Sequence, residues 1–246
     1  MDSSAWFDYF TRNQRADGHI ERVCGTALDP DLRRELALSL ARFQLGEASG
    51  GRIAEEVETA RDPALDLHNR RAIQFYVLEE ARHARELAAL VLALGGTTLT
   101  QHWSSDWFRR VRRCLGLRTK MLTMAAAEVV GIVYYTLLRE RVACSTVERT
   151  LALIAREETR HLNFQAEWFA GAVAHAWWPL RPLLAFGIVL RFSVISCAAV
   201  LFLLADHRHL LARLKVTPLD FVRLSAREVS RRFPLLQERH HAVRVQ

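Results

Sequence analysis

Cysteine, proline and glycine are all scarce in this sequence of 246 residues, and each scarcity excludes a class of protein. The four cysteines lie far apart and form no CxxC pair, so zinc or iron sites built from thiolates are not expected. The cysteines are expected to be reduced thiols. The chain also has no Ser-rich linker, no low-complexity tract and no glycine-rich phosphate loop. The sequence therefore predicts a single compact, mostly helical domain. The cysteines are Cys24, Cys114, Cys144 and Cys197.

Acidic residues are outnumbered by basic ones, and the formal net charge is +7. Residues 206–246 hold nine Lys or Arg against four Asp or Glu, and the stretch WFRRVRRCLGLRTK at 107–120 forms a second basic cluster. No nucleic-acid-binding motif accompanies this charge, so a solvated or membrane-facing surface is expected rather than a nucleic-acid partner. The start, MDSSAWFDYFTRNQ, shows no basic region followed by an apolar run, which predicts a cytoplasmic protein.

Apolar residues recur at intervals of three and four through most of the chain, and strict alternation is nearly absent, so the fold class is all-α. Four long helices are expected at about 30–57, 63–94, 117–142 and 145–172. A long connection that contains Trp103 and Trp107 joins the second helix to the third. Four such helices with one crossover predict a ferritin-like four-helix bundle with additional C-terminal helices.

These helices divide the chain into three parts. Residues 1–30 form an aromatic N-terminal arm, residues 31–176 the bundle, and residues 177–246 a hydrophobic helix and a basic helical tail that pack on the bundle. The hydrophobic stretch at 183–205 is long enough to span a bilayer. Because a charge at mid-span is costly in lipid, Arg191 favours a helix buried against the bundle or a partner subunit. Membrane contact stays open, since basic residues follow directly.

One glutamate lies on the predicted inward face of each of the four helices, and two of the helices add a histidine. The sequence EARH at 80–83 is echoed by ETRH at 158–161, and a further glutamate precedes each copy, as Glu79 and Glu157. Residues three apart on a helix share a face, so each Glu-x-x-His motif can direct a carboxylate and an imidazole to one point. The six inward residues are Glu47, Glu80, His83, Glu128, Glu158 and His161.

Burying four carboxylates without positive charge among them would cost several kcal/mol each and would defeat the fold. Two divalent metal ions carry four positive charges and balance them. The order Glu, Glu-x-x-His, Glu, Glu-x-x-His on successive helices is the ligand set of paired iron or manganese in a bundle core. Each residue alone is ambiguous, since a lone Glu-x-x-His is common and a single glutamate can pair with an arginine. Their conjunction favours a di-metal site.

At these residues the chain resembles the ferritin-like di-iron carboxylate superfamily. The resemblance covers about 31–176, and its stretches are similar to those of bacterial ferritin-like domain proteins that have no settled activity. It implies that Glu47 and Glu128 are single-carboxylate ligands, that Glu80 and Glu158 are paired or bridging ligands, and that the two histidines are terminal ligands. The stretches are LARFQLGEASGGRIAEE, EEARHA, AAAEVVGIVYYTLLRE and REETRHLNFQAEWF.

The resemblance implies the fold and the metal pair but not the reaction. The first hypothesis for the reaction is a non-haem di-iron oxidoreductase that uses dioxygen as co-substrate to oxidise a small organic substrate. The hydrophobic stretch at 183–205 points to an apolar substrate, and the sequence does not identify it. The expected cofactor is a pair of iron ions, or manganese with iron, because the same ligands accept both. About seventy residues follow the bundle, unlike in cage-forming ferritins, and no cysteine-ligated iron domain is present, so an external electron donor is expected. Two alternatives stay open: an iron-binding or peroxide-scavenging protein, and a membrane-associated protein with a structural di-metal site. A homodimer is also open.

Two tyrosines on the predicted inward faces are candidate catalytic residues. Tyr76 lies one turn before Glu80, and Tyr135 lies two turns after Glu128. Each could hydrogen-bond a ligand, gate a pocket or relay an electron, and each is also explained as a core aromatic with a satisfied hydroxyl. Arg82 and Arg160, which precede the two histidines, are expected in surface ion pairs rather than beside the ligands.

Overall fold

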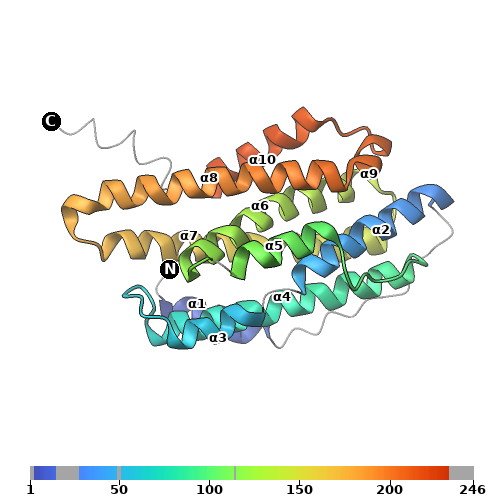
Figure 1. Ribbon diagram of the computed structural model, residues 1–246. Helices are drawn as coiled ribbons and strands as arrows, with labels where there is room; N and C mark the ends of the chain where they lie inside the picture. Colours follow the sequence, from blue (N-terminus) through green and yellow to red (C-terminus); the bar gives the residue numbers. More distant parts are fainter. Residues whose placement is uncertain (1–2, 15–27, 49–50, 114, 233–246) are drawn as a thin grey trace.

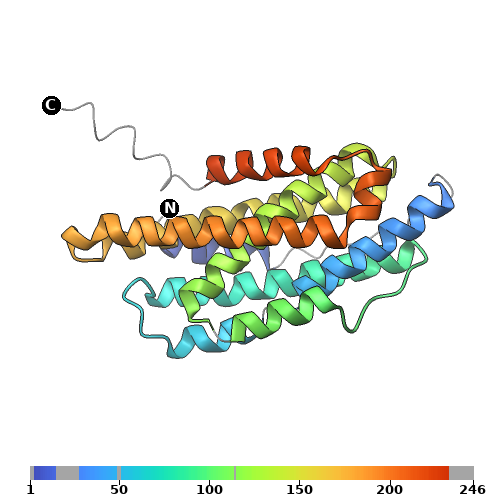
Figure 2. The ribbon, with the colours of Figure 1, turned by 45° about the horizontal axis from the view of Figure 1, so that its top comes forward.

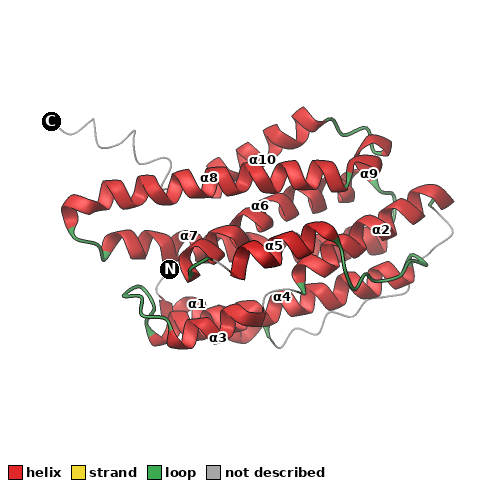
Figure 3. Ribbon diagram, in the orientation of Figure 1, coloured by secondary structure: helices red, strands yellow, loops and turns green. Residues whose placement is uncertain are grey.

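The computed structural model describes residues 3–14, 28–48, 51–113 and 115–232, and these residues form helices joined by short loops, with no strand among them (Figure 3). The all-α prediction is confirmed. Cys24, Cys114 and the tail from residue 233 lie outside the described residues. The helices are α1 (Ser3–Asn13), α2 (Pro30–Glu47), α3 (Gly51–Thr59), α4 (Leu67–Ala93), α5 (Trp103–Arg113), α6 (Leu117–Arg141), α7 (Ser145–Ala174), α8 (Arg181–Asp206), α9 (Arg208–Arg213) and α10 (Pro218–Arg232), with a 3-10 turn at Trp178–Leu180.

Four long helices surround the core. Helix α2 packs on α4, α4 on α7 and α7 on α6 (Figures 1 and 2). Side chains close the ring between α6 and α2, where the Phe43 ring stacks on Tyr134 with the centroids 4.4 Å apart. Helix α6 is buried over nearly its whole length, which explains why its sequence is apolar on all sides. The core between these helices is the place to which inward-facing polar groups must point.

The boundaries of α4 follow from its capping residues. The Asp66 side chain accepts a hydrogen bond from the Asn69 backbone N–H, at 2.7 Å, and so caps the helix four residues later than the expected start near Pro63. The predicted stop at Gly95-Gly96 is confirmed. Gly95 has φ of +78°, the left-handed conformation in which glycine commonly ends a helix.

The prediction of one helix over 30–57 is wrong, because the structure has two helices there. Helix α2 ends at Glu47 and α3 begins at Gly51, and residues 49–50 lie outside the described residues. The sequence GEASGG at 46–51 contains three glycines, and each glycine costs up to about 1 kcal/mol inside a helix. The apolar spacing therefore continues through a stretch that does not favour a helix.

Two segments outside the four long helices contribute to the core. Helix α1 packs on α4, with Trp6 and Phe10 buried and the Trp6 indole N–H donating to Glu167 at 2.8 Å. The long crossover contains helix α5, which was not expected. Its residues Trp107 and Phe108 pack on Phe202 of α8. The aromatic arm and the crossover both cover parts of the core that four helices alone leave open.

Helix α8 packs along α6 and α7 by one face only. The described residues include two helical stretches long and apolar enough to cross a membrane, Leu117–Arg141 and Trp178–Asp206. In the first, which is α6, 89% of the most apolar stretch is buried, as in an ordinary core helix. In the second only 33% is buried, so the expectation that 183–205 is covered by the bundle holds for one side of α8.

The close approach of α4 to α2 generates a stability prediction. A methyl group added at Gly96 would lie 2.7 Å from the Ala37 side chain and 3.2 Å from Val91. We expect Gly96→Ala to lower the free energy of unfolding by about 1–3 kcal/mol, because an overpacked contact must push two helices apart. Urea denaturation measures the change. The control Gly171→Ala, which has open space around it, should be neutral or stabilising, and an equally stable Gly96→Ala variant would contradict the packing described here.

Candidate metal centre

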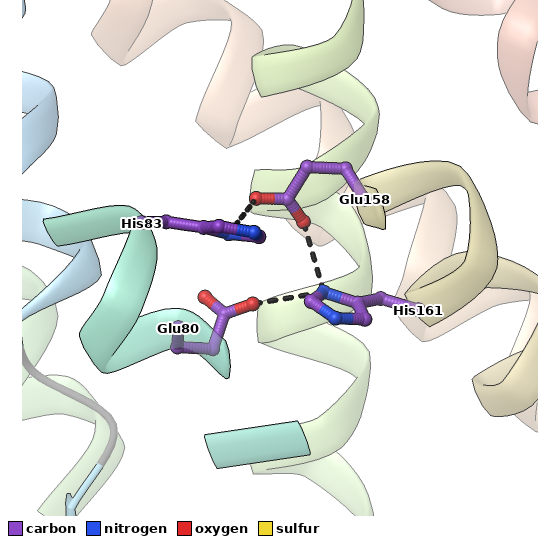
Figure 4. A group of neighbouring side chains, drawn as sticks. All are labelled: Glu80, His83, Glu158 and His161. Carbon is purple, nitrogen blue, oxygen red and sulfur yellow. Dashed lines mark hydrogen bonds and ion pairs between the residues drawn. The ribbon is translucent and has the colours of Figure 1, made fainter. Parts of the chain in front are cut away.

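The two Glu-x-x-His motifs meet in the core between α4 and α7. The side chains of Glu80, His83, Glu158 and His161 are buried, and one ligand atom of each lies within 4.8 Å of the others (Figure 4). The Nδ1 atom of His83 lies 3.1 Å from a Glu158 oxygen. The Nδ1 atom of His161 lies 2.9 Å from Glu80 and 3.2 Å from Glu158. The spacing of three on each helix thus brings four ligand groups together, as the sequence predicts.

Glu128 of α6 lines the cavity beside this group. Its carboxylate accepts hydrogen bonds from the Tyr76 hydroxyl and, at 2.7 Å, from the Gln165 amide. Both donors bind the same oxygen, and the other oxygen, Oε2, is buried with no hydrogen-bond partner. A buried carboxylate oxygen without a donor is costly, so this atom is suited to receive a cation.

Glu47 lies at the end of α2 and is only half-buried. Its carboxylate accepts a hydrogen bond from the Tyr135 hydroxyl at 3.0 Å. Glu47 and Glu128 are not part of the tight group of four, but both line the same cavity as Glu80 and Glu158. The four predicted glutamates therefore line one cavity, and the two predicted histidines lie within 4.8 Å of Glu80 and Glu158.

Without a metal ion, only protons balance the negative charges of the carboxylates in this site. Burial raises the pKa of Glu47 well above its usual value, and the nearby charges of Glu80 and Glu158 raise it further. Burial also raises the pKa of Glu128 well above the ordinary range. Burial opposes the charge on Glu158 as well, but hydrogen bonds from both histidines lower its pKa to about 2. The carboxylates therefore compete for the few positive charges that the core provides.

Those positive charges come from the two imidazoles. Burial opposes protonation of His83, but hydrogen bonds to Glu157 and Glu158 raise its pKa well above the ordinary value. His161 is likewise disfavoured by burial, and its contacts with Glu158 and Glu79 raise its pKa well above the ordinary value. Two imidazolium ions thus occupy the electrostatic role that divalent cations would fill.

A second layer of carboxylates holds the histidines, and it is arranged crosswise. His83 on α4 contacts Glu157 of α7 through Nε2, at 2.8 Å, while His161 on α7 contacts Glu79 of α4 through Nε2, at 2.9 Å. Each imidazole therefore turns Nδ1 toward the ligand group and Nε2 toward a buried carboxylate. Metal-binding histidines characteristically use this arrangement, because the outer carboxylate fixes the ring and its tautomer. The sequence signal was the glutamate that precedes each Glu-x-x-His motif.

Two further residues contact the carboxylates of this second layer. The Asn13 amide of α1 donates to Glu79 at 2.6 Å and to Glu157 at 3.1 Å. The Arg82 guanidinium lies 2.8 Å from Glu157, and its side chain is only 11% exposed. The expectation of a surface ion pair is therefore wrong for Arg82, because α1 covers the side of α4 from which this residue projects. Arg160 is exposed, as expected, and lies over the Tyr9 ring.

A cavity of about 180 Å³ adjoins the carboxylates. Ala127 is the one exposed residue between Lys120 and Tyr135 on α6, because it borders this cavity. Helix α5, which the sequence did not predict, and helix α8, which was predicted to pack on the bundle, supply the far wall. The apolar lining residues are Phe43, Phe108, Met124, Ala127, Val130, Ala199, Phe202 and Leu203, and the polar ones beyond the carboxylates include Arg42, Tyr76, Ser104, Ser105, Arg112, Thr123, Asp206 and His207.

The two candidate tyrosines both donate to carboxylates of the site. Burial raises the pKa of Tyr76 well above its usual value, and the neighbouring Glu128 raises it further. Burial and the charge of Glu47 do the same for the pKa of Tyr135. Both phenols therefore keep their protons and act as hydrogen-bond donors. Tyr76 lines the cavity, whereas Tyr135 reaches the site through Glu47. Their part in any reaction stays a prediction.

The crosswise second layer generates a prediction about metal affinity. Glu79→Gln or Glu157→Gln should weaken metal binding by about 10- to 100-fold, because each removes the charge that holds one histidine. Anaerobic titration calorimetry with ferrous or manganous ion measures the affinity. Glu148→Gln, at an exposed position of α7, is the control and should bind like the wild type. Unchanged affinity in both second-layer variants would contradict a metal role for the histidines.

The raised pKa values of His83 and His161 generate a prediction about pH. An imidazole must lose its proton before it binds a metal, so binding releases protons and the affinity falls as the pH is lowered. We expect about a tenfold loss per pH unit for each proton displaced. Titrations in buffers of different ionisation enthalpy count those protons. Histidine ordinarily titrates in the range from about pH 6 to about pH 8. A metal affinity that does not change over this range would show that the histidines are not ligands.

Comparison of the chain with protein-family models, with curated proteins and with solved structures finds no match. The resemblance to the ferritin-like superfamily therefore stays a prediction, and the geometry of the site is the observation that bears on function.

Proposed function

We propose that the chain is a ferritin-like di-iron protein in which α2, α4, α6 and α7 are the bundle and the six inward residues hold two metal ions. The observation that carries this proposal is the crosswise pairing of each histidine with a ligand carboxylate at Nδ1 and an outer carboxylate at Nε2. The donor set fits the group, since four carboxylates and two imidazoles favour iron or manganese. The unpartnered Glu128 oxygen fits it as well.

We further propose that the protein is a cytoplasmic oxidoreductase that uses dioxygen to oxidise a small organic substrate. A bound iron pair would supply the electrons for dioxygen reduction. The cavity supports a substrate role, because its volume of about 180 Å³ suits a molecule of roughly the size of an aromatic ring. Its walls are largely apolar, and they adjoin Glu80, Glu128 and Glu158 directly. A small, largely apolar substrate is therefore the one that this space fits best.

The protein's own residues would hold the ligands in place and exclude water. Tyr76 and Gln165 both donate to one oxygen of Glu128, which leaves the other oxygen available to a metal ion. Tyr135 would orient Glu47 through the hydrogen bond from its hydroxyl. Phe10 packs against His161, with the ring centroids 5.8 Å apart, and so shields the imidazole from solvent. The described residues include no cysteine-ligated metal group, so the electrons that renew the centre would come from an external donor.

Two other functions use the same centre. An iron-binding or peroxide-scavenging protein would need the ligand group but no organic substrate. In a protein with a purely structural site, the metals would act by tying α4 to α7 and, through Glu47 and Glu128, to α2 and α6. The cavity favours the oxidoreductase over both alternatives, because neither of them requires an apolar space beside the carboxylates.

One experiment separates these functions. Protein reconstituted anaerobically with ferrous ion should hold two irons per chain, by elemental analysis, and should consume dioxygen faster when a suitable member of a panel of small organic compounds is added. Ala127→Leu reduces the volume of the cavity without replacing a ligand, so it should keep both irons and lose most of the stimulation by the organic compound. Ala226→Leu, at an exposed position of α10, is the control.

The outcomes are distinct. Iron that oxidises equally fast in the wild type and in Ala127→Leu, with no organic compound having any effect, would favour the scavenging function. Two irons that stabilise the fold without reacting with dioxygen would favour the structural site. Absence of bound metal after reconstitution would overturn the di-iron proposal as a whole.

A further inference from the structure

Helix α8 carries an apolar stripe on the side that faces away from the bundle. The stripe continues through five turns, so it is roughly 27 Å long at a rise of 1.5 Å per residue. Its leucine, phenylalanine and valine side chains are strongly exposed, from 51% for Leu190 to 68% for Leu183, and Cys197 is exposed as well. Two exposed tryptophans precede the stripe, Trp177 before the 3-10 turn and Trp178 at its first position. The stripe consists of Leu183, Phe186, Leu190, Val194, Cys197 and Leu201.

The helix cannot cross a membrane in this arrangement. Its opposite face, with Ile188, Phe192 and Leu203, is buried along α6 and α7. A crossing helix would carry those helices into the hydrocarbon, and α7 exposes charged residues such as Glu148 and Arg156. Figure 1 shows α8 along the upper side of the molecule beside α10, and in Figure 2 it runs across the middle of the view below α10. Any membrane contact would therefore be parallel to the bilayer surface.

The charges around the stripe suit an anionic lipid surface. Residues 177–205 contain two arginines, Arg181 and Arg191, and no aspartate or glutamate. The neighbouring α10 adds exposed arginines at Arg223 and Arg227. Exposed tryptophans and arginines beside an apolar face are the composition of helices that lie in the lipid interface. An arginine there keeps its head group at the phosphates while its stem lies along the apolar surface.

The same charges disfavour a second copy of the chain as the occupant of the stripe. A two-fold pairing about the middle of the stripe would bring the Arg191 side chains of both copies to the same edge of the contact. No carboxylate in residues 177–205 is available to neutralise them. Like charges that meet across an interface are costly, whereas lipid phosphates would neutralise each arginine.

We propose that the exposed face of α8 is a docking surface for an anionic membrane, into whose interface it inserts parallel to the bilayer plane. The proposal depends on this surface alone and stands apart from the chemistry of the metal centre. The other side of the same helix lines the cavity through Ala199, Phe202 and Leu203. Docking would therefore place the cavity next to the lipid, which is a source of apolar molecules.

Co-sedimentation with vesicles tests the proposal. The full chain should bind vesicles of phosphatidylcholine mixed with phosphatidylglycerol, and bind vesicles of phosphatidylcholine alone more weakly. The double variant Leu183→Gln/Val194→Gln should lose about tenfold or more of this partitioning, because two apolar anchors are removed. Leu67→Gln is the matched control, since Leu67 is as exposed as Leu183, at 68%, but lies on α4. It should bind like the wild type.

Three results would overturn the proposal. The wild type could bind neither kind of vesicle, or the double variant could bind as well as the wild type. The third result is a wild-type dimer, measured by light scattering, that becomes a monomer in the double variant, which would assign the stripe to a second copy. Metal content should be equal in the wild type and the double variant. A failure of the docking proposal is therefore distinguishable from a failure of the di-metal proposal.

Discussion

The structure depends on the burial of several carboxylates around two imidazoles in a core that has little other positive charge. Each carboxylate there carries a large desolvation cost, and removing one partner would leave an uncompensated charge. The protein meets this cost in layers. The two histidines contact Glu158, and the outer glutamates contact the histidines from the opposite helix. Asn13 donates hydrogen bonds to those glutamates, and Arg82 supplies a positive charge beside Glu157. Helix α1 is thus part of the site, although it contributes no ligand.

The crosswise arrangement also explains why α4 and α7 must hold a fixed register. Each helix provides a Glu-x-x-His pair for the candidate centre and a carboxylate that contacts the histidine of the other helix. A shift of one helix by a single residue would turn Glu79 or Glu157 away from its imidazole, since neighbouring residues point about 100° apart. The buried polar network therefore selects one packing of the helices from the many that an apolar core of leucine, valine and alanine would accept. A role in specificity of this kind is known for buried polar groups, though not for all of them.

Local sequence was enough for the long helices and for the four residues that meet between α4 and α7, because a spacing of three fixes a shared face. It was not enough where contacts are remote. The apolar spacing of α2 continues as far as Ala54 and Val57, yet two helices form there, and the sequence between them, GEASGG, contains three glycines. Arg82 is turned from surface to core only because α1, far away in the sequence, covers it. The cavity was equally hidden, since its far wall is built from α5 and α8.

Helices α6 and α8 show why apolar composition alone does not locate a helix. Both are long and apolar enough to cross a bilayer, but α6 is surrounded by protein, while α8 is covered on one side. Arg191 separates the remaining possibilities for α8. A charge at mid-span argues against a crossing helix, and its exposure excludes a place in the core. If α8 docks parallel to the bilayer plane, as we propose, the same arginine would lie at the depth of the lipid phosphates, where its charge is favourable.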